Sequence, residues 1–565
     1  MNDDIVLRME DLRVGFLHEG NYNMAVKGVG YEVRRGRTLG IVGESGSGKS
    51  VSSMSLLGLL PKMPLCKEEG RAFFTASGSD EAVDLLTLAE DDRRKYRGRH
   101  IAMIFQEPMT SLNPVQKCGA QVVEMLQQHE KVSAREARRR ALELFEEVML
   151  PRPDKIFDSY PHEISGGQKQ RVMIAMALIC HPDLLIADEP TTALDVTVQK
   201  AILDLLKRLQ AKYNIGIIFI THDLGVIAQI ADDVAVMYRG EIVEQGPAQQ
   251  VLYQPQHAYT KGLLACRPPL DARPKRLPTV KDFLEGCEPE VDVPGVDNAP
   301  APEREILLSV RDLDVEYALS TNLMGKATKT LKAVDGLSFD VYRGETLGLV
   351  GESGCGKSTL GRALLRLIDK SSGTITYNGQ HLDQLGLRQK KDLRRRMQII
   401  FQDPYSSLNP RITIGEAILE PLCCHHMLDS DKQRRERVLE LMEQVGLETD
   451  WYGRYPHEFS GGQRQRVCIA RALVLNPELV VCDESVSALD VSVQAQVLNL
   501  LNSLKERYGY TYLFITHDLS VVKFLSDRIM VMEKGRIVEM GDADQIFAHP
   551  QHAYTQRLLD ALPRL

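Results

Sequence analysis

The sequence contains no run of apolar residues long enough to cross a membrane, which takes about 20 of them. Its ten cysteines are scattered over 565 residues without the spacing of a disulfide framework. Residues 1–10 are acidic and lack the apolar stretch of a signal peptide. We therefore expect a cytosolic protein with reduced thiols, whose membrane role, if it has one, comes through a partner.

An excess of positive charge is also missing. The net charge is −8, whereas a protein that binds nucleic acid without sequence preference is usually basic. The arginine runs 138–140 and 394–396 are predicted to be solvated helix faces. The apolar fraction of 43% is ordinary for globular domains, and the length suits roughly three or four domain-sized units.

What the sequence does contain is a long internal repeat. Gly43-Glu44-Ser45-Gly46-Ser47-Gly48-Lys49-Ser50 returns as Gly351-Glu352-Ser353-Gly354-Cys355-Gly356-Lys357-Ser358, and Ser165-Gly166-Gly167-Gln168 returns as Ser460-Gly461-Gly462-Gln463. The serine of the second motif precedes Glu189 and Glu484 by 24 residues in either half (165 to 189, 460 to 484). A repeat of this length indicates two homologous halves.

The repeat predicts domains at 1–265 and 306–565, joined by a Pro-rich linker at 266–305. Proline clusters at Val293-Pro294 and Ala299-Pro300-Ala301-Pro302 favour a semi-extended linker. From the loop lysine to the later Phe-Gln pair, the first half is longer than the second (49 to 106, against 357 to 402). We expect the surplus to form a surface loop or hairpin within the polar stretch 66–90.

Each half alternates strand and helix signals. The apolar runs 38–42, 184–187 and 215–220 are typical of buried parallel strands, and 479–482 and 512–515 are their counterparts in the second half. Strands that alternate with helices in this way predict an α/β fold with a mostly parallel sheet.

The Gly-rich segments have the spacing of a phosphate-binding loop, in which backbone N–H groups surround phosphate oxygens at a helix N-terminus. The positions expected to hold phosphate are Gly43, Ser45, Gly46 and Gly48 in the first half, and Gly351, Ser353, Gly354 and Gly356 in the second. Lys49 and Lys357 would reach the β- and γ-phosphates, and Ser50 and Ser358 offer hydroxyls to Mg²⁺.

Acidic pairs end two of the apolar strands, as Asp188-Glu189 and Asp483-Glu484. The Asp suits Mg²⁺, and the Glu is placed to polarise the water that attacks the γ-phosphate. His222 and His517 are expected to contact that phosphate, and Gln106 and Gln402 to contact Mg²⁺ or the water. Taken alone, an Asp-Glu pair would usually be a solvated strand end, and a single histidine would more often be structural. The alternative for each glutamine is a plain surface residue.

The Ser-Gly-Gly-Gln segments offer a hydroxyl and unhindered N–H groups at an expected helix N-terminus, which makes an anion site. Together with the other motifs they resemble the ATPase subunits of ABC transporters, over nearly the whole chain except the linker. The resemblance implies tandem P-loop NTPase (ABC-type) nucleotide-binding domains in the α/β class. Each would have a RecA-like, mostly parallel sheet core, an antiparallel β portion and a helical signature subdomain.

The resemblance also implies composite sites, because in this family the signature of one half closes over the nucleotide of the other. The first site would comprise Lys49, Ser50, Gln106, Asp188, Glu189 and His222, closed by Ser460, Gly461, Gly462 and Gln463. The second would comprise Lys357, Ser358, Gln402, Asp483, Glu484 and His517, closed by Ser165, Gly166, Gly167 and Gln168. Both halves keep the Glu and the His, so we expect two sites that hydrolyse ATP with Mg²⁺.

Further positions follow from the same resemblance. Asp195 and Asp490 match the family's D-loop. Phe16 and Tyr317 stand where an aromatic ring stacks on adenine, with core packing as the alternative.

Two more repeated segments resemble the dipeptide/oligopeptide importer branch of the family, which also handles nickel chelates and glutathione. They are 107–114 with 403–410, and Gln256-His257-Ala258-Tyr259-Thr260 with Gln551-His552-Ala553-Tyr554-Thr555. The resemblance implies an energy-coupling ATPase, peripheral on the cytoplasmic face of the membrane. Its partners would be two integral membrane permease subunits near the Gln106 and Gln402 segments and, indirectly, an extracytoplasmic substrate-binding protein.

The alternative is a soluble twin-ATPase that acts on ribosomes or nucleic acid. Such relatives tend to have a charged helical linker or zinc modules, whereas this linker is Pro-rich and has no Cys-x-x-Cys pair. No nucleic-acid partner is therefore expected.

Some importer relatives hold an iron–sulfur cluster on four cysteines after the first half, but only Cys266 and Cys287 lie there, which argues against a cluster. Cys423-Cys424-His425-His426 is not expected to bind one metal ion, because adjacent helical residues point in different directions.

Overall fold

The computed structural model of the chain describes residues 4–79, 81–106, 111–191, 194–287, 305–321 and 327–562. Residues 107–110 of the repeated segment after Gln106, and the proline clusters at 293–302, lie outside this described part. The chain divides into two compact units. The described residues up to 264, with Val280–Cys287, form the first unit, and Ala265–Thr279 with residues 305–562 form the second.

The described part of the first unit contains a six-stranded sheet that leads to the Gly-rich loop. Its order is β10 (Glu241–Pro247), β9 (Asp233–Tyr238), β3 (Thr38–Val42), β8 (Gly216–Thr221), β7 (Leu184–Asp188) and β6 (Ile101–Ile104). All neighbours are parallel except β9 and β10. Every residue of β3, β7 and β8 is buried, as predicted for parallel strands covered on both faces.

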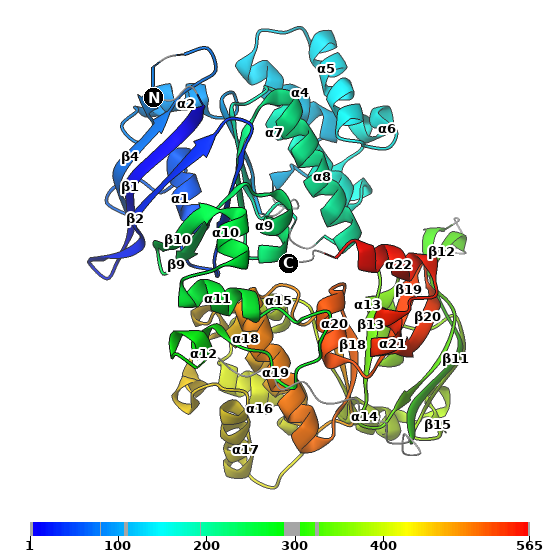
Figure 1. Cartoon of the computed structure of the whole chain (residues 1–565). Helices are drawn as coiled ribbons and strands as arrows, with labels where there is room; N and C mark the ends of the chain where they lie inside the picture. The colour runs from blue at the N-terminus through cyan, green and yellow to red at the C-terminus, as the bar shows by residue number, and fades with distance from the viewer. Residues whose placement is uncertain are drawn as a thin grey trace. The chain divides into compact units, whose positions relative to one another are not determined.

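An antiparallel sheet packs beside it, in the order β2 (Asn21–Arg34), β1 (Ile5–His18), β4 (Cys66–Phe74) and β5 (Val83–Asp84) (Figure 1). Alternate apolar side chains of β1 and β2 share one core with β3, β7 and β8. The surplus stretch 66–90 includes β4 and β5, so the extra length lengthens this sheet and the loop between its strands.

Helices cover the sheets and form a separate helical portion. The portion next to the signature comprises α4 (Cys118–His129), α5 (Ala134–Glu147), α6 (Pro153–Asp158), η1 (Pro161–Glu163) and α7 (Gly166–Leu178). The others are α1 (Lys49–Leu56), α2 (Glu90–Tyr96), α8 (Val196–Tyr213), α9 (Leu224–Ile230), α10 (Ala248–Tyr253), α11 (Ala258–Ala265) and α12 (Val280–Leu284). None of the helices in the described part of the chain is long and apolar enough to span a bilayer.

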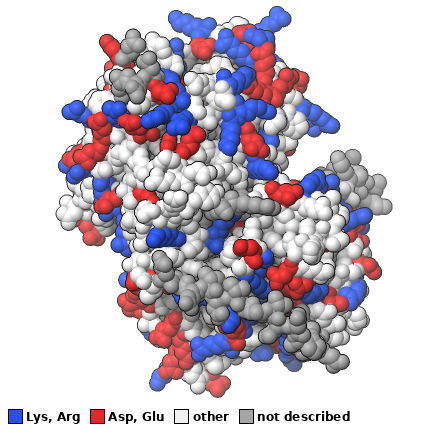
Figure 2. Space-filling model, in the orientation of Figure 1, with Lys and Arg blue, Asp and Glu red and all other residues white. Residues whose placement is uncertain are grey.

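The arginines at 138–140 lie on α5, as predicted for a solvated helix face. Arg139 forms ion pairs with Glu136 and Glu143 at 2.6 Å each, and Arg140 pairs with Glu130 and Glu136 at 2.9 Å each. On the face shown in Figure 2, positive and negative side chains are interspersed over both units.

The second unit repeats this architecture. Its six-stranded sheet has the order β16 (Met397–Ile400), β17 (Leu479–Asp483), β18 (Thr511–Ile515), β13 (Thr346–Val350), β19 (Arg528–Glu533) and β20 (Arg536–Asp542). Its antiparallel sheet has the order β12 (Ala327–Tyr342), β11 (Ile306–Thr321), β14 (Ser372–Tyr377) and β15 (Gln380–His381).

Most helices of the second unit have a counterpart in the first. The helices of the second unit are α13 (Lys357–Leu364), η2 (Leu382–Gln384), α14 (Leu387–Arg396), α15 (Pro404–Ser407), α16 (Ile414–Cys424), α17 (Asp431–Gln444), η3 (Thr449–Gly453), η4 (Pro456–Glu458), α18 (Gly461–Leu473), α19 (Val491–Tyr508), α20 (Leu519–Leu525), α21 (Ala543–Ala548) and α22 (Ala553–Asp560).

Part of the expected linker is packed into the second unit. The backbone N–H of Leu277 donates to the amide oxygen of Asn499, and the Asn499 amide donates back to the Leu277 carbonyl, both at 2.8 Å. Lys523 donates to the carbonyl of Leu270, and Arg273 to the carbonyl of Phe524 at 3.2 Å. Leu277 is also fully buried. Side chains of α19 and α20 therefore hold this segment through hydrogen bonds to its backbone.

The next stretch of the linker belongs to the first unit instead. Val280, at the start of α12, is buried, and a Cβ built on Gly262 of α11 would lie 2.9 Å from its Cα. The two helices therefore approach so closely that only glycine fits at position 262.

Candidate functional sites

The Gly-rich loop of the first unit wraps around a buried lysine. Lys49, at the first turn of α1, is 5% exposed, and its Nζ donates to the carbonyls of Gly43 at 2.7 Å and Glu44 at 2.9 Å. Gly48 has a φ of 98°, which favours glycine, and a Cβ there would lie 2.6 Å from the carbonyl oxygen of Ala25. The loop thus holds an ammonium group beside a helix N-terminus, which is an arrangement for binding phosphate.

The second unit reproduces this geometry closely. The Nζ of Lys357 donates to the carbonyls of Gly351 at 2.7 Å and Glu352 at 2.9 Å. Gly356 has a φ of 110° and precedes α13 as Gly48 precedes α1.

A hydroxyl and a carboxylate meet at the edge of each loop. Ser50 Oγ donates to Asp188 Oδ1 at 3.0 Å, and Ser358 Oγ donates to Asp483 Oδ1 at 2.7 Å. Each aspartate is 3% exposed, and burial raises the pKa of Asp188 to about 6 and also raises that of Asp483. Oxygen donors of this kind are what Mg²⁺ prefers, and a cation there would stabilise the buried carboxylate. The residues therefore fit a magnesium ion.

The glutamate after each aspartate is held from two sides. Gln106 Nε2 donates to Glu189 Oε2 at 3.0 Å, while His222 Nδ1 lies 3.4 Å from Glu189 Oε1. In the second unit the matching distances are 2.9 Å from Gln402 to Glu484 and 3.5 Å from His517 to Glu484. The structure therefore brings together three residues that are spread along each half, from 106 to 222 in the first and from 402 to 517 in the second.

The electrostatics of the second cluster favour a charged pair. Burial by itself would raise the pKa of Glu484, but the hydrogen bond from His517 and the positive charges of His517 and Lys357 together outweigh it, and the pKa is lowered. Burial would likewise lower the pKa of His517, but its contact with Glu484 raises it. Lys357 adds a positive charge 3.9 Å from the same carboxylate. Glu484 is thus held as an anion able to accept hydrogen bonds.

The backbone at these glutamates is unusual. Glu189 and Glu484 both have a φ of 47°, in the left-handed region that non-glycine residues rarely adopt. Their N–H groups donate to Ile220 and Ile515 of the neighbouring strands, each at 2.9 Å. Strain of this kind persists where the surroundings fix it, and it commonly marks functional positions. Here it turns each carboxylate from its strand end toward the glutamine and the histidine.

The signature segments begin helices, as predicted. Ser165 caps α7, where its Oγ accepts from the Gln168 N–H at 3.3 Å and its own N–H donates to the Gln168 side chain at 3.0 Å. Ser460 and Gln463 form the same capping box at α18. Ser165 and Ser460 are exposed, so each helix N-terminus is open to an anion.

The second glycine of each signature is required by packing. A Cβ on Gly167 would lie 2.8 Å from Val198 of α8, and one on Gly462 would lie 2.2 Å from Val493 of α19. Among the described residues, the exposed glycines Gly166 and Gly461 have no such close neighbour.

The residues expected at the adenine differ between the halves. Phe16 is half-buried against the core of the first unit, whereas Tyr317 is 42% exposed on β11. Asp195, of the expected D-loop, caps α8 through its contact with Val198 N–H at 2.9 Å; Asp490 precedes α19 without such a side-chain cap.

Sequence reasoning missed one contact to each loop. The N–H of Glu44 donates to the hydroxyl of Tyr259 at 3.1 Å, and the N–H of Glu352 donates to Tyr554 at 3.0 Å. These tyrosines belong to the repeated Gln-His-Ala-Tyr-Thr segment and are buried. The recurrence of that segment in both halves was a signal for them, but their partners lie more than 200 residues away in sequence.

Two phosphate-binding loops, each with a hydroxyl–carboxylate pair and a Gln–Glu–His cluster, define a protein with two P-loop nucleotide-hydrolysing units. The model of the ABC transporter family matches residues 26–192 and 334–487. The model described as the oligopeptide/dipeptide transporter C-terminal region matches residues 243–288 and 538–565. The chain therefore belongs to the ABC transporter family, as the motifs predicted, and it is an ATPase that couples ATP hydrolysis to transport.

Curated relatives match along almost the whole chain. The glutathione import ATP-binding protein GsiA of Shigella boydii serotype 4 is 48% identical over 99% of this chain and 89% of its own length. The GsiA protein of Escherichia coli K12 shows the same identity and coverage. A solved dimeric structure of the ATP-binding cassette MJ0796, bound to ADP and Pi, is 27% identical with a TM-score of 0.38, and covers 42% of this chain and 99% of its own.

Proposed function

We propose that the chain is the peripheral ATPase of an importer for short peptides such as glutathione, on the cytoplasmic face of the membrane. Two integral membrane permease subunits would carry the solute, and an extracytoplasmic binding protein would deliver it. The family and the repeated oligopeptide/dipeptide region support this role, and the relatives named for glutathione import support the solute class.

Within each half, we assign the roles by geometry. Lys49 and Lys357 hold the β- and γ-phosphates from inside the loop. Bound Mg²⁺, held by Ser50 with Asp188 and by Ser358 with Asp483, would neutralise charge on the phosphates.

The glutamates act on the attacking water. One carboxylate oxygen of Glu189 contacts Gln106 and the other faces His222, so the group is oriented before a water binds. A carboxylate held in this way can accept the water's proton as the oxygen attacks the γ-phosphorus. We propose that His222, beside it, donates a hydrogen bond to the γ-phosphate. Gln402, Glu484 and His517 have the same roles in the second half.

In the ATP-bound state, we propose that the signature of each half completes the other half's site. The exposed N-termini of α7 and α18 support this role, because each offers N–H groups and a serine hydroxyl to an anion. Tyr317 and Phe16 would flank the adenine.

The observation that carries the proposal is the Gln–Glu–His cluster, present with nearly equal distances in both halves. The double variant Glu189→Gln with Glu484→Gln keeps the hydrogen-bonding shape but removes the base. We expect it to bind ATP normally and to lose turnover by about 100-fold or more. Each single variant should lose turnover as well, and Glu241→Gln, at an exposed position on β10, serves as the control.

Hydrolysis of the double variant at the wild-type rate would refute the assignment of the glutamates. Purification from detergent-solubilised membranes tests the partners separately. Two integral membrane proteins should accompany the chain, and recovery of ribosomal RNA in their place would contradict the transport role.

A further inference from the structure

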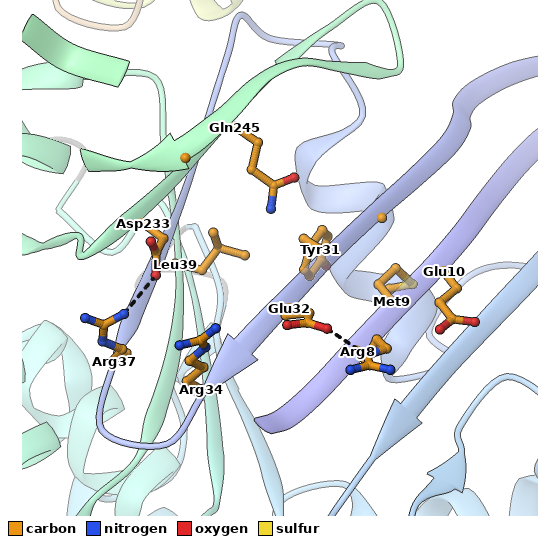
Figure 3. Close-up of a pocket in the computed structure, with 12 residues that line it drawn as sticks. Arg8, Met9, Glu10, Tyr31, Glu32, Arg34, Arg37, Leu39, Asp233 and Gln245 are labelled. Carbon is orange, nitrogen blue, oxygen red and sulfur yellow. Dashed lines mark hydrogen bonds and ion pairs between the residues drawn. The ribbon is translucent and has the colours of Figure 1, made fainter. Parts of the chain in front are cut away.

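A pocket of about 700 Å³ opens in the first unit, away from the phosphate-binding loop. It lies where β1 and β2 meet the start of β3 and β9 and the end of β10 (Figure 3). Its volume is within the usual range for small-molecule sites. The buried residues Met9, Tyr31 and Leu39 make up the part of its lining that is closed to solvent. We refer to it as the seam pocket.

Charged side chains of both signs line the seam pocket in equal number. Two ion pairs account for four of them: Arg8 with Glu32 at 2.8 Å, and Arg37 with Asp233 at 3.5 Å. The other two, Arg34 and Glu10, form no ion pair or side-chain hydrogen bond within the described part of the chain. Figure 3 shows Arg34 next to Arg37 at one end and Glu10 at the other.

The second unit provides an internal comparison, because strand register assigns each position a counterpart. Arg34 pairs with Ile5 in β1, as Tyr342 pairs with Ile306 in β11. Asp233 pairs with Leu39, as Arg528 pairs with Leu347. The counterparts of Arg34 and Asp233 are therefore Tyr342 and Arg528.

In the second unit these counterparts contact one another. The guanidinium of Arg528 lies 5.0 Å from the ring centre of Tyr342 and 3.3 Å from Glu345, the counterpart of Arg37. The counterpart of Glu10 is Arg311, which pairs with Asp340 at 2.8 Å. Both charges that lack a partner in the first unit are thus replaced by groups that have one. The lone charges of the seam pocket are a property of the first half and not of the shared fold.

The charge pattern selects the chemistry of a ligand. Three arginines and three carboxylates cancel, so a polyanion such as a nucleotide would face repulsion as well as attraction. A molecule with one carboxylate and one ammonium group would pair with Arg34 and Glu10. Ile5, beside Arg34, and Glu10 are five residues apart on β1, about 16 Å at roughly 3.3 Å per residue. The side chains of Arg34 and Glu10 extend over part of this distance. The gap that remains between their charged groups is about the length of a peptide of two or three residues.

We propose that the seam pocket binds a short zwitterionic peptide, with its C-terminal carboxylate on Arg34 and its N-terminal ammonium on Glu10. The residues that line the seam pocket include none of those assigned to either ATP site.

Calorimetric titration of the full chain tests this proposal with three probes. They are trialanine, N-acetyl-trialanine, which lacks the ammonium, and trialanine amide, which lacks the carboxylate. The wild type should bind trialanine and bind each capped form about tenfold more weakly. Arg34→Gln should bind trialanine and its amide equally, and Glu10→Gln should bind trialanine and its N-acetyl form equally.

Matched variants in the second half are the controls. Tyr342→Gln and Arg311→Gln change the counterpart positions and should leave all three affinities as in the wild type. ATP turnover reports on folding and should be unchanged in Arg34→Gln and Glu10→Gln. Absence of trialanine binding to the wild type, or full discrimination between the probes in Arg34→Gln, would overturn the proposal.

Discussion

A tyrosine near the end of each half contacts the phosphate-binding loop of that half. Removing its hydroxyl tests whether this contact fixes the conformation of the loop. Tyr259 is fully buried, and its hydroxyl accepts from the N–H of Glu44 at 3.1 Å. The substitution Tyr259→Phe removes this acceptor and keeps the ring, which lies 4.2 Å from the ring of Tyr238. The loop would then have one partly buried N–H without its protein acceptor.

The magnitude follows from the cost of that unpaired group. A buried donor left without a partner costs about 1 to 3 kcal/mol, and the partial exposure of Glu44 places this one in the lower half of the range. About 1 to 2 kcal/mol corresponds to roughly a 5- to 30-fold change in an equilibrium constant. We expect the loop to bind ATP in this conformation. The free-energy cost then weakens ATP binding and leaves the rate of the hydrolysis step unchanged.

The assay is ATP binding and steady-state turnover of Tyr259→Phe, Tyr554→Phe and the double variant. We expect a higher KM and a weaker Kd for ATP, with kcat nearly that of the wild type. Tyr253→Phe, at a 54% exposed tyrosine on α10, is the matched control. Unchanged ATP affinity in the double variant would refute the idea that these hydroxyls hold the loops.

Three further outcomes are expected. Burial would raise the pKa of Asp183, but hydrogen bonds from neighbouring side chains lower it from 3.8 to about 2. Its contribution of roughly 2 kcal/mol is therefore complete above about pH 4 and lost as the pH falls toward 2. Asp183→Asn should lower the urea midpoint at pH 7, and the difference from wild type should shrink below pH 4. Asn499→Ala removes both hydrogen bonds to Leu277 and should speed proteolytic cleavage within 265–279, as mass spectrometry of the fragments would show. Ser50→Ala should raise the Mg²⁺ concentration needed for half-maximal turnover by about tenfold, and an unchanged Mg²⁺ titration would contradict the assigned cation site.

Much of the fold could be predicted because its signals are local. Continuous apolar runs predict the buried strands β3, β7 and β8, and glycine spacing predicts the turn from β3 into α1. The order of the strands could not be predicted in this way. In the sheet, β3 lies between β8 and β9, although both of these strands are far from β3 in the sequence. This pairing depends on the packing of the whole sheet.

The site divides in a similar manner. The identities of Glu189, Gln106 and His222 follow from motifs that recur in both halves. Their mutual contacts, and the left-handed backbone at Glu189, depend on where the three strands β6, β7 and β8 end. The contact of Tyr259 is harder still to predict from the sequence. Nothing in the residues around this buried tyrosine of α11 indicates a partner more than 200 positions away.

Residues 265–287 are divided between the two units in a way that makes the chain hard to split into separate halves. The chain leaves the first unit at 264, supplies Leu277 to the second, and returns at Val280 to pack on α11 before the second repeat begins. Asn499 and Lys523, which bind this segment, are Asp204 and Ala228 at the corresponding positions of the first repeat. No single cut of the polypeptide therefore yields two complete units. Splitting it at 264 deprives the first half of α12, and splitting it at the repeat boundary deprives the second half of a core segment.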